Sequence, residues 1–172
     1  MFFNYIKEFI LKKIVKKKLL NDKAIVNTKQ ISSVGLLLDE KHFQFCNQIT
    51  KELVNAGISE NQIEVLGFKN KINKNETFNF LVFSYKSISI NGHFNDKNFL
   101  DFIAKPSDLL INFYELEKAP LMMVSVSSKA EFKVGFGSVD KRVNNFIIDT
   151  ETNDYKVFLN ELFKYLKILN KL

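Results

Sequence analysis

Apolar residues recur at intervals of three and four along residues 2–20, which contain neither Gly nor Pro, and this pattern predicts a helix. The helix carries two apolar stripes, displaced from each other around its axis. Their residues are Phe3, Ile6, Phe9, Ile10 and Ile14 for the first, and Leu11, Val15 and Leu19 for the second. A helix that docks on its own domain needs only one such face. The other face is therefore free to meet a partner, a second copy of the chain or lipid, unless both stripes pack on the domain.

The rest of the chain alternates short apolar runs with amphipathic segments. The runs predict strands at 34–38, 63–68, 78–85, 109–114, 132–136 and 145–148. The amphipathic segments predict helices at 40–56, around 99–103, at 119–130 and at 154–172. Asp39 can cap the first of these helices, and Gly57 ends it. Residues 87–90 read as a strand extension, or as one arm of a hairpin that closes at Asn91-Gly92.

Strands that alternate with helices predict an α/β fold with a mainly parallel, doubly wound, Rossmann-like sheet of five or six strands. The basic amphipathic helix precedes this sheet, and a second amphipathic helix closes the chain. A length of 172 residues with 46% hydrophobic composition fits one globular domain. The expected organisation is a helical arm at 1–20, a polar linker at 21–32 and a single α/β domain at 33–172.

Positive charge is concentrated in the arm. Six of the 25 basic residues lie there, opposed only by Glu8: Lys7, Lys12, Lys13, Lys16, Lys17 and Lys18. Residues 21–172 hold 19 basic and 18 acidic side chains, so the body is almost neutral. These six lysines are the predicted partner-binding residues. Four of them lie near the carboxyl end of the helix, where cations also favour the helix dipole, and this is the alternative explanation of their position.

No motif in the chain predicts catalysis, a cofactor or a metal. A dinucleotide site needs glycines after the first strand, where this chain has Leu38-Asp39-Glu40-Lys41. His42 and His93 have no partner at metal-ligand spacing, and His42 is expected on an exposed helix turn. Cys46 is the single cysteine, which excludes an intramolecular disulfide and fits a small buried hydrophobe.

A ligand of a doubly wound sheet lies beyond the carboxyl ends of the strands. This rule places four residues nearest to such a ligand, and they are the candidate ligand-binding residues: Asp39, Tyr85, Asn112 and Tyr114. Asp39 has the alternative role of a helix cap. The two tyrosines have the alternative role of core residues with hydrated hydroxyl groups.

Two resemblances accompany these patterns. The segment SDLLINFYELEKAPLMMVSVSSKAEFKVGF, residues 107–136, resembles the strand, helix and short Gly-Phe strand of the amino-terminal Rossmann-like half of lipopolysaccharide heptosyltransferases. Those enzymes bind a nucleotide sugar with a second such half, for which this chain has no room. The whole chain, from FFNYIKEFILKK to YKVFLNELFKYLKILNKL, resembles a family of small uncharacterised bacterial proteins with no assigned activity.

The function expected first is a non-enzymatic binding or adaptor protein, attached through residues 2–20 to an anionic surface, with the cytoplasmic face of a membrane as the best fit. RNA or a ribosomal surface is an alternative partner, although the single arginine, Arg142, disfavours specific recognition of nucleic acid. A sugar- or nucleotide-binding, glycosyltransferase-like domain is another alternative, and the second stripe could instead form a homodimer. The expected location is the cytoplasm, peripheral to the inner face of the membrane in the first case.

Overall fold

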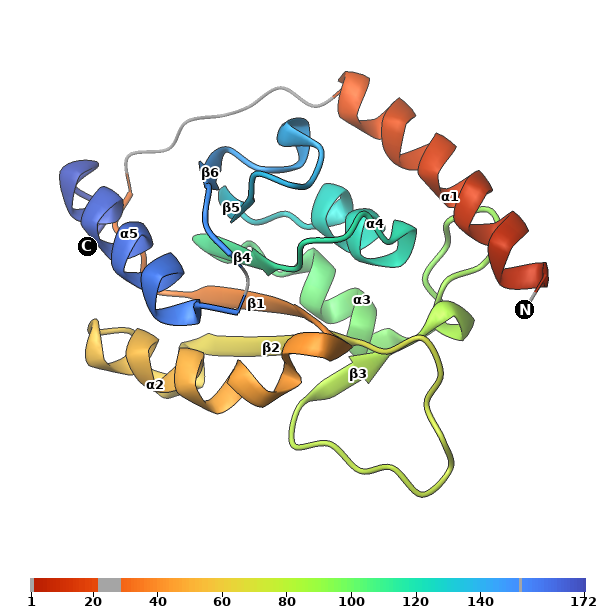
Figure 1. Ribbon diagram of the computed structural model, residues 1–172, viewed down its shortest axis with the longest axis horizontal. Coiled ribbons are helices and arrows are strands. Elements are labelled where there is room, and N and C mark those ends of the chain that lie inside the picture. Colours follow the sequence, from red (N-terminus) through yellow and green to blue (C-terminus); the bar gives the residue numbers. More distant parts are fainter. Residues whose placement is uncertain (1, 22–28, 152) are drawn as a thin grey trace.

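The computed structural model describes residues 2–21, 29–151 and 153–172 (Figure 1). Its strands are β1 (Val34–Asp39), β2 (Ile63–Phe68), β3 (Leu81–Phe83), β4 (Leu109–Phe113), β5 (Phe132–Phe136) and β6 (Phe146–Ile148). Its α-helices are α1 (Phe2–Asn21), α2 (Cys46–Asn55), α3 (Lys97–Ala104), α4 (Ala119–Ser127) and α5 (Tyr155–Ile168). Short 3-10 helices lie at η1 (Glu40–Phe45), η2 (Glu60–Gln62), η3 (Tyr85–Ser87) and η4 (Lys141–Val143).

The six strands form one parallel sheet in the order β3-β2-β1-β4-β5-β6. This is the strand order of the dinucleotide-binding Rossmann fold, in which the direction of winding reverses between β1 and β4. Every residue of β1 and β4 is buried, which explains why these strands read as unbroken apolar runs rather than as alternating patterns. The predicted α/β, parallel, doubly wound sheet is confirmed.

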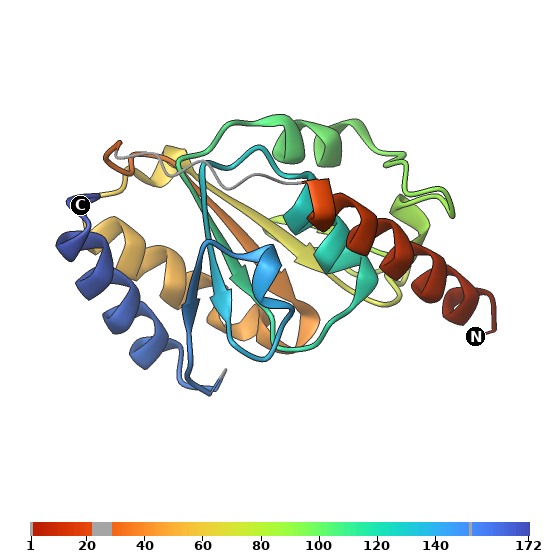
Figure 2. The same cartoon turned by 90° about the horizontal axis from the view of Figure 1, so that it is seen from above.

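Helices cover both faces of the sheet, as predicted. α2 and α5 pack on one face, where Leu36, Ile111 and Phe158 belong to a single apolar cluster. α3 and α4 pack on the other face, with Leu37, Leu110 and Phe99 in a second cluster. Successive residues of a strand point to opposite faces, so the neighbours Leu36 and Leu37 serve different cores. Figure 2 shows α2 and α5 together on one side of the sheet and α1 on the side of α4.

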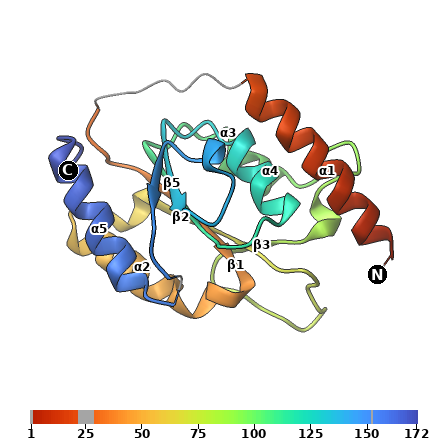
Figure 3. The ribbon, with the colours of Figure 1, turned by 45° about the horizontal axis from the view of Figure 1, so that its top comes forward.

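The helix α4 is buried on all sides, from Ala119 to Ser125. The sheet covers its inner side, and α1 packs on it from outside (Figure 3). Leu11, Val15 and Leu19 of α1 are buried in the same cluster as α4. α1 therefore adds a layer outside α4, and its second apolar stripe is the one that docks on the body.

The expected linker, 21–32, falls largely outside the described residues, but its last part is held firmly. The backbone N–H of Ile31 donates to the carbonyl of Lys171 at 2.8 Å. The buried Asp108 carboxylate, just before β4, accepts hydrogen bonds from the backbone N–H and hydroxyl groups of both Ser32 and Ser33. The chain therefore enters β1 in a fixed position.

Two segments differ from their predicted structure. Residues 40–45 form the 3-10 helix η1 rather than the first turns of an α-helix. Side chains three residues apart eclipse each other in a 3-10 helix, and the rings of His42 and Phe45 are stacked with centroids 6.3 Å apart. The predicted strand 78–85 pairs only at Leu81–Phe83: before it, the rings of Phe78 and Phe80 contact that of Phe43, and after it Ser84 caps η3.

The hairpin alternative at Asn91-Gly92 is confirmed in a short form. Ile88 and Phe94 make an isolated antiparallel bridge, and Gly92 lies between them with a φ of +79°. Glycine adopts this left-handed conformation without a steric penalty. The turn also brings Gly92 against Met123 of α4 and Ile14 of α1, so three separate segments meet there.

Candidate functional site

The outer face of α1 is apolar at its amino end. Phe3 is 66% exposed and Phe9 is 58% exposed, and Ile6 between them is also exposed. These three residues belong to the first predicted stripe, whose other members, Ile10 and Ile14, are half-buried. In Figure 2 the amino end of α1 projects beyond the rest of the molecule. Large exposed apolar side chains on a projecting element are typical of an interaction surface.

The six predicted partner-binding lysines divide into two groups. Three are engaged within the protein. Lys7 is buried and its Nζ donates to the carbonyl of Tyr85 at 2.6 Å, and burial lowers the pKa of Lys7. Lys12 pairs with Glu8 at 3.4 Å, and Lys18 Nζ donates to the Ser127 hydroxyl at 3.2 Å.

The other three lysines, Lys13, Lys16 and Lys17, are exposed on α1. The ammonium group of Lys13 lies over the ring of Phe9, 4.4 Å from its centroid. Cationic and aromatic groups therefore share one face of the helix. We define the outer face of α1 as Phe3, Ile6, Phe9, Lys13, Lys16 and Lys17.

Glu8 fixes the position of α1 on the body. Its carboxylate accepts a hydrogen bond from the backbone N–H of Ala119 at 2.8 Å and another from the hydroxyl of Tyr85 at 2.6 Å. Ala119 is the first residue of α4, whose amino end carries a partial positive charge that favours a carboxylate. Burial and the bond to Glu8 together raise the pKa of Tyr85. This predicted ligand-binding residue is therefore engaged at the junction of α1 and α4.

The switch point of the sheet, between the carboxyl ends of β1 and β4, contains an ion pair. Lys118 lies just before α4, and its Nζ is 2.7 Å from Asp39 Oδ2 and 4.0 Å from Glu40 Oε1. Asp39 is buried, and it also accepts the backbone N–H of Lys41, which is the predicted capping bond. In a dinucleotide-binding protein this place belongs to the ligand. Here two side chains of the chain itself fill it, and no glycine lets a phosphate approach the backbone.

Asn112 and Tyr114 lie beneath α4 rather than at an opening of the sheet. Both are buried, and both are hydrogen-bonded to Ser125 of α4: the serine hydroxyl donates to Asn112 Oδ1 at 2.7 Å and lies 2.8 Å from the tyrosine hydroxyl. Asn112 also donates to Asn144 Oδ1 at 2.7 Å. Buried polar groups that satisfy one another in this way fix how two elements pack. The network fixes α4 on β4.

The expectation that His42 lies on an exposed helix turn is wrong. Its side chain is 3% exposed and packs edge-on against Phe113, with ring centroids 5.4 Å apart. His42 is the buried residue of η1 and lies next to the Asp39 and Lys118 pair. Burial lowers the pKa of His42, partly opposed by the negative charges of Asp39 and Glu115. Its Nδ1 is one of two buried side-chain polar atoms without a hydrogen-bond partner in the described part of the chain, the other being Asn144 Nδ2.

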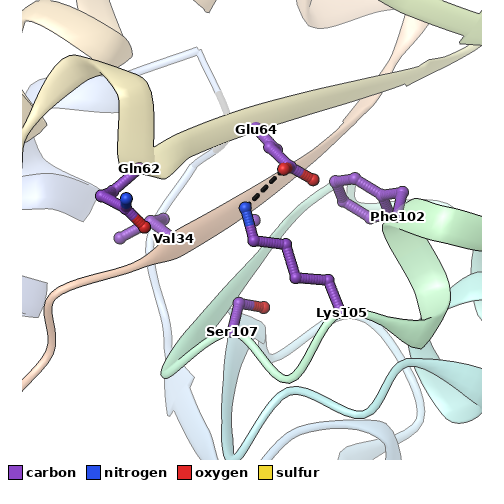
Figure 4. A pocket seen from close by; sticks show the side chains of 7 residues that line it. Val34, Gln62, Glu64, Phe102, Lys105 and Ser107 are labelled. Carbon is purple, nitrogen blue, oxygen red and sulfur yellow. Dashed lines mark hydrogen bonds and ion pairs between the residues drawn. The ribbon is translucent and has the colours of Figure 1, made fainter.

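A small hollow lies at the opposite end of the sheet, at the amino ends of β1, β2 and β4 (Figure 4). Val34, Gln62, Phe102 and Ser107 line it together with Gly35, Glu64 and Lys105. The side chain of Lys105 crosses it to form an ion pair with Glu64. The hollow is therefore neutral, and it is remote from the switch point where α/β sheets bind ligands.

The described residues contain no group of three His, Cys, Asp or Glu side chains that could hold a metal ion. Cys46 is buried, as predicted, and burial raises the pKa of its thiol. Across residues 2–21, 29–151 and 153–172, no helix combines the length and apolar character needed to cross a bilayer.

Sequence reasoning missed Glu8, Lys118 and the burial of His42. Glu8 offered one signal, as the only acidic residue in a helix of six lysines. Its partners lie 77 and 111 residues away in the chain, so no local pattern could identify them.

Comparison with known proteins places the chain in a group without giving it an activity. The model of a protein family described as "Family of unknown function (DUF6913)" matches residues 7–169. No curated protein and no solved structure matches the chain. The resemblance of residues 107–136 to heptosyltransferases stays a prediction.

Proposed function

The chain thus belongs to DUF6913, a family of unknown function, and we propose that this member binds the surface of an anionic membrane through the outer face of α1. The observation that carries the proposal is the combination of exposed Phe3 and Phe9 with exposed lysines on one helix of an otherwise almost neutral chain. In this proposal α1 attaches the body to the membrane, which is the role of a binding or adaptor protein.

The arrangement of this face suits a membrane interface. Phe3, Ile6 and Phe9 occupy the projecting half of α1, and Lys13, Lys16 and Lys17 follow them toward the body. The apolar side chains would enter the boundary between headgroups and acyl chains, while the ammonium groups stay among the headgroups. Each lysine near an anionic surface contributes about 1 kcal/mol, so the three together contribute about 3 kcal/mol. Such binding is reversible and depends on salt.

The alternatives lack a comparable observation. Arg142, the single arginine, lies on η4 and forms a bidentate pair with Asp140, which leaves α1 with lysines only. Bidentate recognition of phosphates or bases by guanidinium groups of α1 is therefore disfavoured. For a nucleotide or sugar site, the switch point is filled by Asp39 and Lys118. Binding to RNA becomes an outcome of the experiment below.

The test is co-sedimentation with vesicles made of equal parts phosphatidylcholine and phosphatidylglycerol. A variant with Lys13, Lys16 and Lys17 changed to Gln should bind about 100-fold more weakly, because about 3 kcal/mol corresponds to about two factors of ten. The matched control changes Lys156, Lys164 and Lys167 of α5 to Gln, which removes the same charge from the opposite face. This control should stay within twofold of wild type.

Three results would refute the proposal. Equal weakening by both triple variants would show that only net charge matters. Equal binding of the wild type to vesicles of phosphatidylcholine alone would remove the role of anionic lipid. Failure to bind the anionic vesicles, together with binding to RNA that weakens steeply with salt, would identify nucleic acid as the partner.

A further inference from the structure

Resting on the proposed function, we infer that α1 binds lipid while it remains docked on α4, so that membrane contact fixes the orientation of the whole body. The alternative is a helix that leaves the body and enters the membrane by itself. The two differ in what happens to α4 and in which surfaces of the body face the lipid.

The first argument is that opposite faces of α1 are buried and exposed. Successive residues of an α-helix are rotated by about 100°, so residues two positions apart lie on nearly opposite sides. Leu11 and Val15 are buried against α4, whereas Phe9 and Lys13 are exposed. The face offered to lipid is therefore complete without the docked face, and lipid binding does not require α1 to leave.

The second argument is the set of contacts that α1 would lose if it left the body. Glu8 would lose the backbone N–H of Ala119 and the hydroxyl of Tyr85, and Lys7 would lose the carbonyl that accepts from its buried ammonium group. α4 would lose its cover, because Leu11, Val15 and Leu19 would leave the apolar cluster that they share with it. Ile14, which packs against the same apolar cluster, would leave Gly92. Polar and apolar contacts both oppose the release of α1.

The third argument concerns direction. α1 lies outside α4 on one side of the sheet, and α2 and α5 lie on the other side (Figures 1 and 2). When the outer face of α1 rests on the membrane, α5 faces the solution. η4, with exposed Lys141 and Arg142, lies beside the carboxyl half of α1. Besides the hydrogen bond from Arg142, the positive charge of Lys16 on α1 contributes to lowering the pKa of Asp140, which caps η4. Because Arg142 is paired with Asp140, Lys141 is the basic group that η4 adds beside α1.

The primary experiment uses the unmodified protein. Hydrogen exchange of the backbone amides of α4 is measured with and without vesicles of equal parts phosphatidylcholine and phosphatidylglycerol. Docked binding predicts unchanged protection in Met122–Ser127 and slower exchange in the first turns of α1. Faster exchange in α4 on binding would overturn the inference.

A covalent lock supplies the second readout. Lys18→Cys and Ser127→Cys, whose native side chains are hydrogen-bonded at 3.2 Å, are joined by a short bis-maleimide. The control is the same variant with both thiols capped separately, which has the same charge. Locked protein should bind vesicles within twofold of capped protein, and a loss of tenfold or more on locking would overturn the inference. If neither form nor the wild type binds, the proposed function fails and this inference fails with it.

Orientation is tested with a fluorophore at one of two exposed positions, Leu20→Cys on α1 or Ile168→Cys on α5, which are 76% and 64% exposed. A quencher attached to the lipid should reduce emission at position 20 and leave position 168 unchanged. Equal quenching at both positions would mean that the body has no fixed orientation, which would overturn the inference.

Discussion

The change Leu11→Ala tests whether α1 is part of the folded body. Leu11 is 0% exposed and lies in the cluster that joins α1 to α4. Truncation of a fully buried leucine lowers the free energy of unfolding by roughly 2–5 kcal/mol, and we expect about 3 kcal/mol here because one wall of the site is a single helix that can partly close the cavity. For a protein of this size each kcal/mol lowers Tm by about 2–4 °C, so the expected fall is about 6–12 °C.

The matched control is Leu20→Ala, the same change on the same helix at a side chain that is 76% exposed. It should alter the free energy of unfolding by no more than about 0.5 kcal/mol. Urea and thermal denaturation followed by circular dichroism give both values, and both proteins should unfold in one transition. If Leu11→Ala and Leu20→Ala unfold at the same urea concentration, α1 is not docked on α4 in solution, and the reasoning is refuted.

Two further changes test groups inside the body. Burial lowers the pKa of His42, so the unfolded chain binds a proton at this residue more readily than the folded protein does. The free energy of unfolding of the wild type should therefore fall as the pH drops below about 6.5. The fall should reach up to about 1.4 kcal/mol per pH unit until the folded pKa is reached. In urea titrations at several pH values, His42→Phe should remove this part of the pH dependence, and the control His93→Gln, at an exposed position, should keep it. If the stability of His42→Phe changes with pH as steeply as that of the wild type, His42 is not the responsible group. Burial of Asp108 favours its neutral form, but the hydrogen bonds from Lys29, Ser32 and Ser33 outweigh this effect and hold the pKa of Asp108 below its usual range. The contribution of this carboxylate to stability is therefore present above about pH 4 and is lost as the pH falls through the folded pKa. At pH 7, Asp108→Asn should lower the free energy of unfolding by roughly 2–3 kcal/mol, and a loss equal at pH 7 and pH 2 would show that the charge is not responsible.

Local patterns were sufficient for the fold class. The buried strands β1 and β4 are unbroken apolar runs because helices cover both faces of the sheet, and α5 shows its period of three and four because only one of its faces is buried. α4 was predicted as a helix as well. Its burial on every side has a cause that no local pattern contains, since its cover comes from Leu11, Val15 and Leu19, more than 100 residues earlier.

The candidate site was predicted less completely for the same reason. The stripes and lysines of α1 are visible in the sequence, but which stripe docks depends on α4, and the burial of Lys7 depends on a carbonyl 78 residues away. His42 was misplaced because a polar side chain was expected to face solvent, although its spacing of four and seven residues from the buried Cys46 and Ile49 places it on the inner side. At the switch point, the sequence predicts the capping bond of Asp39, whereas its ion-pair partner Lys118 lies 79 residues further along and follows no motif.

The distance in sequence between α1 and α4 has a consequence for synthesis. Glu8 and its partner Ala119 are 111 residues apart, and ribosomes add about 5–20 residues per second, so α1 leaves the ribosome roughly 6–20 s before the helix that it covers. During this interval both apolar stripes of α1 lack their partners within the chain. The nascent segment therefore exposes more apolar surface to chaperones than the same helix does in the finished protein. This period ends when α4 folds and buries the stripe of α1 formed by Leu11, Val15 and Leu19.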